Sequence, residues 1–314
     1  MKKKLRRWLA LLAVKLLIFL TRIVPRRWGH TLFSLLGTVA FRLYRKERDL
    51  AMRNVSMAFP EVDTLIARAV ARGAFLYLGR NTFDALSLVH ASRDTILDLC
   101  TVEGEEYLRI AYERGNGVIG LTGHIGCWEL LAAYFSEKGY TVSVIARELR
   151  DGRLNGMLVE MRRRHGIVSI PRGATAVAGY RVLRKGEILG MLIDQDIDVD
   201  GVFVPFFGVP AHTPRGVAVF ALRSGAPIVP LGIHLQPDGS QRITIFPEIE
   251  VPPAGLPDQE RIDELTGRCS EAVERLIRIY PQQWVWFHDR WRKRPVGSGG
   301  STIQPVQEEK AGLY

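Results

Sequence analysis

From about residue 102 onward, short apolar runs alternate with amphipathic stretches, and this order constrains the fold more than any other feature of the sequence. The apolar runs have the length and composition of buried strands, whereas the stretches between them repeat apolar residues with a helical period. Strands are expected at residues 117–121, 141–146, 167–170, 188–193, 227–234 and 242–249, and helices at residues 128–138, 154–164, 174–185, 214–224 and 259–280. This alternation predicts an α/β fold in which helices cover both faces of a sheet.

Local signals at the ends of these elements refine the expectation. The segment QPDGSQ at residues 236–241 is typical of a tight hairpin turn. It predicts one antiparallel pair, so the sheet is expected to be mixed and mostly parallel. Thr213 followed by Pro214 predicts the N-cap and first turn of the helix at residues 214–224.

Positive charge is concentrated at the N-terminus. The net charge is +10, yet residues 1–46 hold twelve of the 43 Lys and Arg residues and none of the 33 acids. The rest of the chain is therefore close to neutral, which argues against a nucleic-acid partner. The apolar segment at residues 8–24 lies among these bases and contains Lys15 and Arg22. It predicts a retained membrane anchor, either a tilted span or a helix lying in the interface; a buried helix is the alternative.

These features divide the chain into four parts. We expect a membrane-anchor helix (residues 1–25), a helical N-terminal portion that packs on the body (26–101), an α/β domain (102–295) and a flexible, glycine-rich tail (296–314). The three cysteines, Cys100, Cys127 and Cys269, form neither a disulfide framework nor a zinc-binding spacing. Their number and separation fit a reducing cytoplasmic compartment.

His124 and Glu129 lie where an expected strand turns into a helix. The strand ends before Gly123, His124 follows in the turn, and the helix begins near Cys127. An imidazole can take a proton from a hydroxyl when a second group holds its other nitrogen, and Glu129 can supply that group. We therefore expect His124 as a general base with Glu129 as its partner. The alternative is a capping or core histidine beside a glutamate that the helix dipole favours.

A basic segment follows the second expected strand. Arg147 comes directly after that strand, and residues 147–185 hold ten Lys and Arg residues against three acids. Open α/β sheets bind ligands at the carboxyl ends of their strands, and the planar guanidinium group suits phosphate or carboxylate. We expect an anionic substrate here, although a solvated helix face is the alternative for any single arginine.

Acids and aromatics mark three later positions. Asp194 and Asp196 follow an apolar strand, where acids can orient a base, hold a metal or receive a sugar hydroxyl. A metal needs more oxygen ligands than the sequence offers, so none is predicted. The aromatics of residues 202–210 either line an acyl pocket or pack in the core. Residues 284–294 interleave aromatics with bases, which favours packing or a membrane interface over stacking on nucleic acid.

Several motifs occur together between residues 45 and 294. They are NVSMAFPE at residues 54–61, HIGCWE at 124–129, RRRHG at 162–166, DQD at 194–196, PFFGVPAHTPRG at 205–216, and W-x-W-x-H-x-R-W ending at Trp291. In this order they resemble the bacterial lipid A biosynthesis (late) acyltransferase family, the lauroyl and myristoyl transferases. The joint match is far more specific than any one motif.

The resemblance implies a function and a set of site residues. The implied fold is similar to that of glycerol-3-phosphate acyltransferases. The implied enzyme moves a fatty acyl group from acyl carrier protein to a hydroxyl of a lipid A precursor, an anionic glycolipid, at the cytoplasmic face of the inner membrane, without a cofactor. His124 would be the general base and Glu129 its partner. The polar residues bordering the substrate would be Arg147, Arg162, Arg164 and Asp194.

One position departs from the family, which commonly has Asn where this chain has Cys127. A thiol is a poorer hydrogen-bond donor than an amide, so orientation or substrate choice can differ locally. A cysteine beside a histidine also permits a rival mechanism through an acyl-cysteine intermediate. Alternative functions are acylation of another glycolipid or a lysophospholipid, or a membrane-bound scaffold that keeps the fold without the reaction.

Overall fold

A seven-stranded sheet forms the centre of the computed structural model, which describes residues 2–295. Its strands are β1 (Cys100–Glu103), β2 (Val118–Thr122), β3 (Val142–Ala146), β4 (Val168–Pro171), β5 (Ile188–Leu192), β8 (Ile228–Leu235) and β9 (Gln241–Ile245). A separate hairpin consists of β6 (Gly201–Phe206) and β7 (Val209–Pro214). The tail expected at residues 296–314 lies outside the described residues.

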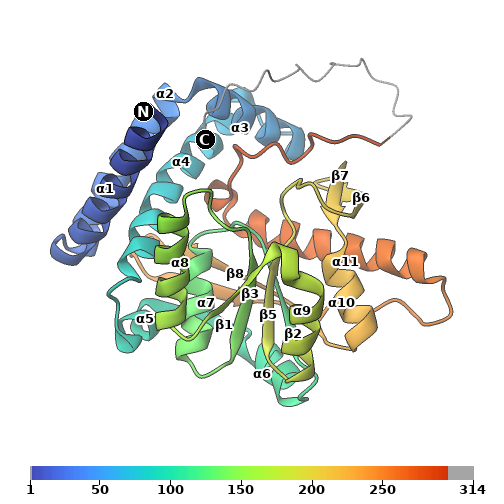
Figure 1. The fold of residues 1–314 in the computed structure, drawn as a ribbon. Helices are drawn as coiled ribbons and strands as arrows, with labels where there is room; N and C mark the ends of the chain where they lie inside the picture. Colours follow the sequence, from blue (N-terminus) through green and yellow to red (C-terminus); the bar gives the residue numbers. More distant parts are fainter. Residues whose placement is uncertain (1, 296–314) are drawn as a thin grey trace.

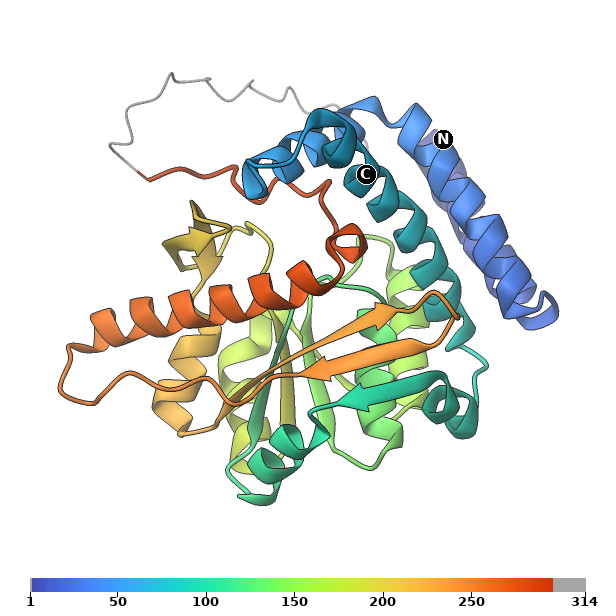
Figure 2. The same ribbon diagram turned by 180° about the vertical axis from the view of Figure 1, so that it is seen from behind.

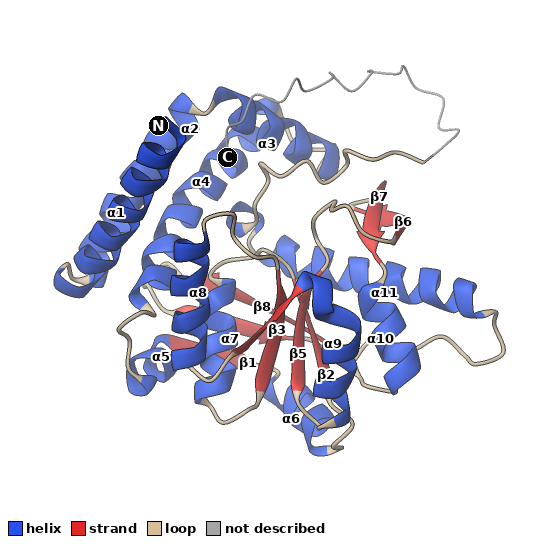
Figure 3. Ribbon diagram, viewed as in Figure 1, coloured by secondary structure: helices blue, strands red, loops and turns tan. Residues whose placement is uncertain are grey.

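Helices enclose the sheet (Figure 3). They are α1 (Lys2–Ile23), α2 (Arg26–Leu43), α3 (Arg45–Ala58), α4 (Thr64–Ser87), α5 (Arg93–Leu99), α6 (Glu105–Glu113), α7 (Trp128–Glu137), α8 (Gly152–Arg164), α9 (Thr175–Arg184), α10 (Gly216–Ser224) and α11 (Asp258–Ile279), with short 3-10 turns at Arg172–Ala174 and Pro281–Gln283.

The sheet is mixed and mostly parallel, as the sequence predicts. Its strand order is β1-β9-β8-β2-β5-β3-β4, and only the β8–β9 pair is antiparallel. The predicted hairpin turn joins these two strands. Because β2 and β5 lie in the middle and are parallel, their carboxyl ends meet at one edge of the sheet. That edge is where a ligand is expected in such a fold.

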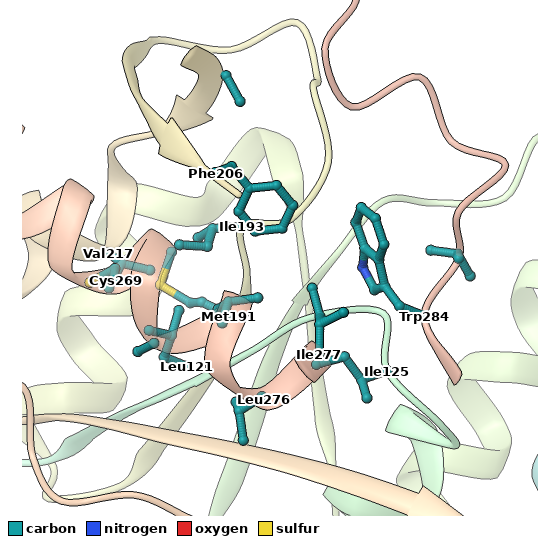
Figure 4. Packing of buried hydrophobic residues seen from close by; sticks show 14 of the residues in the cluster. Leu121, Ile125, Met191, Ile193, Phe206, Val217, Cys269, Leu276, Ile277 and Trp284 are labelled. Carbon is teal, nitrogen blue, oxygen red and sulfur yellow. The ribbon is translucent and has the colours of Figure 1, made fainter. Parts of the chain in front are cut away.

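Two apolar layers cover the two faces of the sheet. Helices α6, α7 and α8 contribute to one buried cluster, and α9, α10 and α11 contribute to the other. Figure 2 shows α11 lying across the sheet on the second face. On that face Phe206 and Trp284 pack near Met191 and Ile193, so the hairpin and the C-terminal segment close the core beyond the strand ends (Figure 4). Helices on both faces confirm the predicted α/β architecture.

The N-terminal helices pack on the body through α4 (Figure 1). Helix α2 crosses α4 closely because glycines stand at the crossing: a Cβ on Gly37 would lie 2.3 Å from the Phe75 carbonyl oxygen, and one on Gly79 would lie 2.2 Å from that of Phe33. An ion pair to the buried Asp84 fixes the same contact, since the half-buried Arg26 donates to both carboxyl oxygens of Asp84. Residues 26–101 were expected to be helical, and the structure has the helices α2 to α5 in this portion until β1 begins at Cys100.

Helix α1 corresponds to the expected anchor segment. Among the described residues, no helix combines the length and apolar character needed to cross a bilayer. Many of the large apolar side chains of α1 and α2 are exposed. Membrane anchoring therefore stays a prediction.

One segment at the end of the β6–β7 hairpin folds differently from expectation. The segment containing Thr213 and Pro214 ends strand β7, so the predicted N-cap is wrong and α10 begins at Gly216 after Arg215. The Thr213 hydroxyl instead donates to the Ala211 carbonyl and accepts a hydrogen bond from a buried arginine of the C-terminal segment. Tertiary contacts therefore hold this segment extended although its local signal favours a helix start.

Candidate active site

The site lies at the carboxyl ends of the two central strands. Thr122 of β2 is the register partner of Leu192 of β5. The residues two positions later, His124 and Asp194, are therefore brought together from points seventy positions apart in the chain. A glycine permits this approach, because a Cβ on Gly123 would lie 3.0 Å from an Asp194 carboxyl oxygen.

Asp194 holds the His124 ring. The ring Nδ1 lies 2.9 Å from Asp194 Oδ1, and the His124 backbone N–H donates to Oδ2 over 2.6 Å. The Trp284 indole N–H also donates to Oδ2, over 2.7 Å. Burial opposes ionisation of this carboxyl, but the charge of His124 and these hydrogen bonds outweigh it and lower the pKa of Asp194 to about 2. Asp194 is therefore a carboxylate near neutral pH, and Nδ1 is the hydrogen-bond donor.

This geometry leaves the other ring nitrogen of His124 available for chemistry. The side chain is one-quarter exposed and lines a cavity of about 990 Å³. The Trp128 ring contacts the imidazole edge to face, with centroids 5.0 Å apart, and limits its rotation. An imidazole whose Nδ1–H is held by a carboxylate can accept a proton at Nε2, which is the arrangement of a general base.

The predicted contact between Glu129 and His124 is wrong, because the carboxyl group at the ring is that of Asp194. Glu129 lies in the first turn of α7 and accepts two hydrogen bonds from Arg162 of α8, at 2.8 and 2.5 Å. A planar guanidinium group matches a carboxylate through two parallel bonds. Both side chains line the cavity, so Glu129 remains at the site with a different partner. Asp194 takes the place predicted for Glu129 at the ring, and orienting a base was one of the roles that the sequence suggested for Asp194.

The predicted arginines do not all reach the cavity. Arg147 and Arg162 line it, whereas Arg164 is exposed and donates to the Val89 carbonyl over 2.6 Å. Arg172, directly after β4, joins Arg147 at the rim. Partial withdrawal from water and the positive charge of Arg147 lower the pKa of Arg172. An anion bound beside both guanidinium groups would relieve their repulsion.

Several site residues were missed in the sequence, although some carried a signal. Arg172 follows β4 as Arg147 follows β3, so the rule of strand ends could have found it. Arg215 and Arg223 also line the cavity, from the start and the last turn of α10. Trp284 had no local signal, because its contact with Asp194 joins residues 90 positions apart.

The aromatic segments build the core. Phe206 and Phe207 are buried, as are Trp284 and Trp286, so the packing alternative holds for both segments. Asp196, the second acid after β5, contacts a hairpin histidine and accepts a hydrogen bond from the Lys293 backbone N–H. Within residues 2–295 the structure contains no group of three or more His, Cys, Asp or Glu side chains suited to a metal ion.

Cys127 lacks the properties of a nucleophile. The residue is buried at the N-cap of α7, and its thiol lies 3.5 Å from the Asn81 carbonyl oxygen, to which it donates. Burial and the negative charge of Asp84 raise the pKa of Cys127 well above its ordinary value. The thiolate is the reactive form of cysteine, so this environment argues against the acyl-cysteine mechanism.

Comparison of the sequence with known proteins groups the chain with acyltransferases. Residues 2–293 match the family described as bacterial lipid A biosynthesis acyltransferase. The lipid A biosynthesis lauroyltransferase of Escherichia coli K12 is 26% identical over 294 residues, which cover 93% of this chain and 94% of that protein. The palmitoleoyltransferase of the same organism is 24% identical over 85% of this chain and 86% of its own. A phosphatidylinositol mannoside acyltransferase of Mycolicibacterium smegmatis is 22% identical over 73% of each chain.

Proposed function

The chain belongs to the bacterial lipid A biosynthesis acyltransferase family, and from this membership we propose that it transfers a fatty acyl chain from acyl carrier protein to a hydroxyl of a lipid A precursor. The proposal makes His124 the general base and Asp194 the group that orients it. Its main support is the hydrogen bond between His124 Nδ1 and Asp194 at the wall of a large cavity.

The reaction follows from this hydrogen bond. Nε2 of His124 accepts the proton of the acceptor hydroxyl, and the oxygen attacks the thioester carbonyl carbon. The C–S bond then breaks, and the thiolate leaves with the proton from the imidazolium. Asp194 stabilises the imidazolium between these steps without taking the proton, since its pKa is about 2.

The basic rim supports an anionic acceptor. Arg147 and Arg172 lie at neighbouring strand ends, and among the described side chains no carboxylate pairs with Arg147. We propose that this pair binds a phosphate of the glycolipid. Glu129 acts through Arg162, because its carboxylate fixes the guanidinium group at the cavity wall.

The N-terminal helices support membrane association. In α1, residues Leu5, Leu9, Leu12, Leu16, Phe19 and Ile23 follow a spacing of three and four and are all more than half exposed. They form a continuous apolar stripe beside Lys and Arg residues, a composition that suits an anionic membrane surface. We propose that the enzyme acts at the cytoplasmic face of the inner membrane through this stripe.

Replacement of His124 by Ala tests the proposal. We expect kcat/KM for transfer from lauroyl acyl carrier protein to a lipid A precursor to fall by about 10²–10⁴-fold, the range for loss of a general base, with an unchanged circular dichroism spectrum. Cys127→Ala is the matched control and should retain most of the activity, because a direct transfer needs no thiol. Full activity of His124→Ala would overturn the role of His124 as the base, and absence of transfer by the wild type would favour a scaffold. Loss in Cys127→Ala with trapped acyl-protein in the wild type would favour the acyl-cysteine mechanism.

The mycobacterial relative raises a second acceptor class, since it is named a phosphatidylinositol mannoside acyltransferase. Purified enzyme offered a lipid A precursor, a phosphatidylinositol mannoside and a lysophospholipid in parallel separates these classes. We expect the lipid A precursor to be acylated fastest, as read by mass spectrometry of the products. A higher kcat/KM with either other acceptor would replace the proposed substrate.

A further inference from the structure

Two neighbouring strands of the sheet each have a glycine at the same level. Gly120 of β2 and Gly190 of β5 are register partners in the parallel ladder. Both line the cavity that His124 lines. Gly120 lies four residues before His124, so at about 3.3 Å per strand residue it is roughly 13 Å deeper in the molecule. The two glycines form a smooth strip across the sheet below the histidine.

Packing does not require a glycine at position 120. A Cβ there would meet Ile188 Cγ2 at 3.4 Å and Leu231 Cδ2 at 3.5 Å, which are ordinary contacts. At Gly190 the space is tighter, since a Cβ would lie 3.2 Å from Val144 Cγ1. Glycine in the interior of a strand weakens it, and it often marks close approach of a ligand to the backbone. The open surface at Gly120 therefore needs a reason other than packing.

The surroundings of the strip are apolar. The ideal Cβ positions at Gly120 and Gly190 point toward the face that carries α6, α7 and α8. On this face the cavity is lined by Leu108, Phe135, Val142, Ile188 and Leu231. Glu129 and Arg162 also line the cavity, where their charges are paired with each other. Arg162 lies 3.4 Å from Ser169 of β4, which is level with Gly190 but separated from it by β3. Directly around the two glycines the wall is apolar, which suits a flexible hydrocarbon better than a polar group.

We propose that the alkyl chain of the acyl donor lies over Gly120 and Gly190, and that the missing side chains at this level set the longest chain the enzyme accepts. The inference rests on the proposed function and adds to it the residues that select the chain. With the thioester carbonyl at His124, the terminal methylenes of a long acyl chain reach the strip. A side chain at position 120 would occupy their space.

The test is a chain-length profile of Gly120→Ala and Gly120→Val. Each variant is assayed with decanoyl, lauroyl, myristoyl and palmitoyl acyl carrier protein on the same acceptor. One methylene in an apolar pocket is worth about 10-fold or more in discrimination. We therefore expect kcat/KM for the longest chain that the wild type uses well to fall at least ~10-fold relative to the shortest, with Gly120→Val shifted further than Gly120→Ala.

Gly232→Ala in β8 is the matched control. This glycine also lies in a central strand, but its Cβ would face Leu276 of α11 on the opposite side of the sheet, at 3.2 Å. We expect its profile to match that of the wild type. A folded Gly120→Val variant with an unchanged profile would overturn the inference, as would an equal shift in Gly232→Ala.

Binding separates this inference from the proposed function. Affinities of the wild type and Gly120→Val for decanoate, laurate, myristate and palmitate can be measured by calorimetry in the absence of any acceptor. If Gly120→Val binds only the long acids more weakly than the wild type does, the result supports the inference about the two glycines. That support does not depend on transfer: a wild type that transfers no chain would refute the proposed function and leave this binding result standing. Equal loss of affinity for all four acids, or none, contradicts the strip while leaving the transfer reaction intact.

Discussion

The carboxyl group of Asp194 accepts three hydrogen bonds while it is withdrawn from water, and two of them come from His124. Its position follows from the register of two parallel strands. The sequence identified Asp194 as an acid at a strand end and His124 as the base, but it placed Glu129 against the ring. Local spacing suggested that pairing, whereas the true partner comes from an adjacent strand distant in sequence. Such contacts depend on the register in which the strands pair. That register is set by interactions across the whole sheet, and local spacing along the sequence does not reveal it.

Replacing Asp194 by Asn tests the role of this carboxylate in catalysis and stability. The change removes the charge that holds the ring tautomer, so we expect kcat to fall by about 10²–10⁴-fold. The folded pKa of Asp194 is about 2, below the ordinary 3.8. The carboxylate therefore stabilises the folded state by ~2 kcal/mol above pH 3.8, and this contribution is lost as the pH falls toward 2.

Urea titrations at pH 7 and pH 3 measure this loss. Between these two pH values the wild type should lose about 1 kcal/mol more of unfolding free energy than Asp194→Asn, because only the wild type takes up a proton at this site. Equal losses would show that the Asp194 carboxyl titrates alike in the folded and unfolded chains. Asp196→Asn, which leaves the His124 contact in place, provides a second reference.

At the scale of the elements, the strongly patterned segments were predicted well. Six apolar runs became the strands from β2 to β9 that form the sheet, and the predicted turn joins β8 to β9. The hairpin of β6 and β7 was missed because its prolines and aromatics resemble a loop. It is held by contacts from elsewhere: the Ser270 hydroxyl donates to the Pro205 carbonyl, and Arg290 donates to the His212 carbonyl.

Glycines decide how closely α2 and α4 approach, and this contact can be measured. In Gly37→Ala the new Cβ would lie 2.3 Å from the Phe75 carbonyl oxygen, so the helices must separate. We expect a loss of about 1–3 kcal/mol in unfolding free energy, typical of overpacking. Gly156→Ala in α8 is the control. Nothing lies within 4 Å of its Cβ position, and alanine should stabilise that helix by about 0.5–1 kcal/mol. Equal effects of both changes on urea midpoints would contradict the close crossing.

On the scale of the whole molecule, the N-terminal helices and the cavity rim are neighbours. Arg153 lies over the Trp8 ring of α1, 5.4 Å from its centroid. The same side chains border a cleft of about 410 Å³ between α1 and the segment that begins α8. That segment follows Arg147 and Leu149, which line the large cavity. A membrane bound at α1 would therefore lie close to the entrance through which a lipid acceptor reaches His124.

Leu12→Glu/Leu16→Glu, a double variant in the exposed stripe of α1, tests this arrangement. The two leucines are 52% and 57% exposed, so their replacement leaves the fold intact. Burial of one leucine in the membrane is worth about 1.5–3 kcal/mol. Sedimentation with vesicles containing phosphatidylglycerol should therefore show at least ~100-fold weaker partitioning. Transfer to a vesicle-embedded acceptor should fall in parallel, whereas transfer to an acceptor in detergent micelles should persist, because the catalytic residues are unchanged. Val177→Glu, 72% exposed on α9, is the matched control and should sediment as the wild type does. Undiminished binding of the double variant would place the membrane contact elsewhere on the surface.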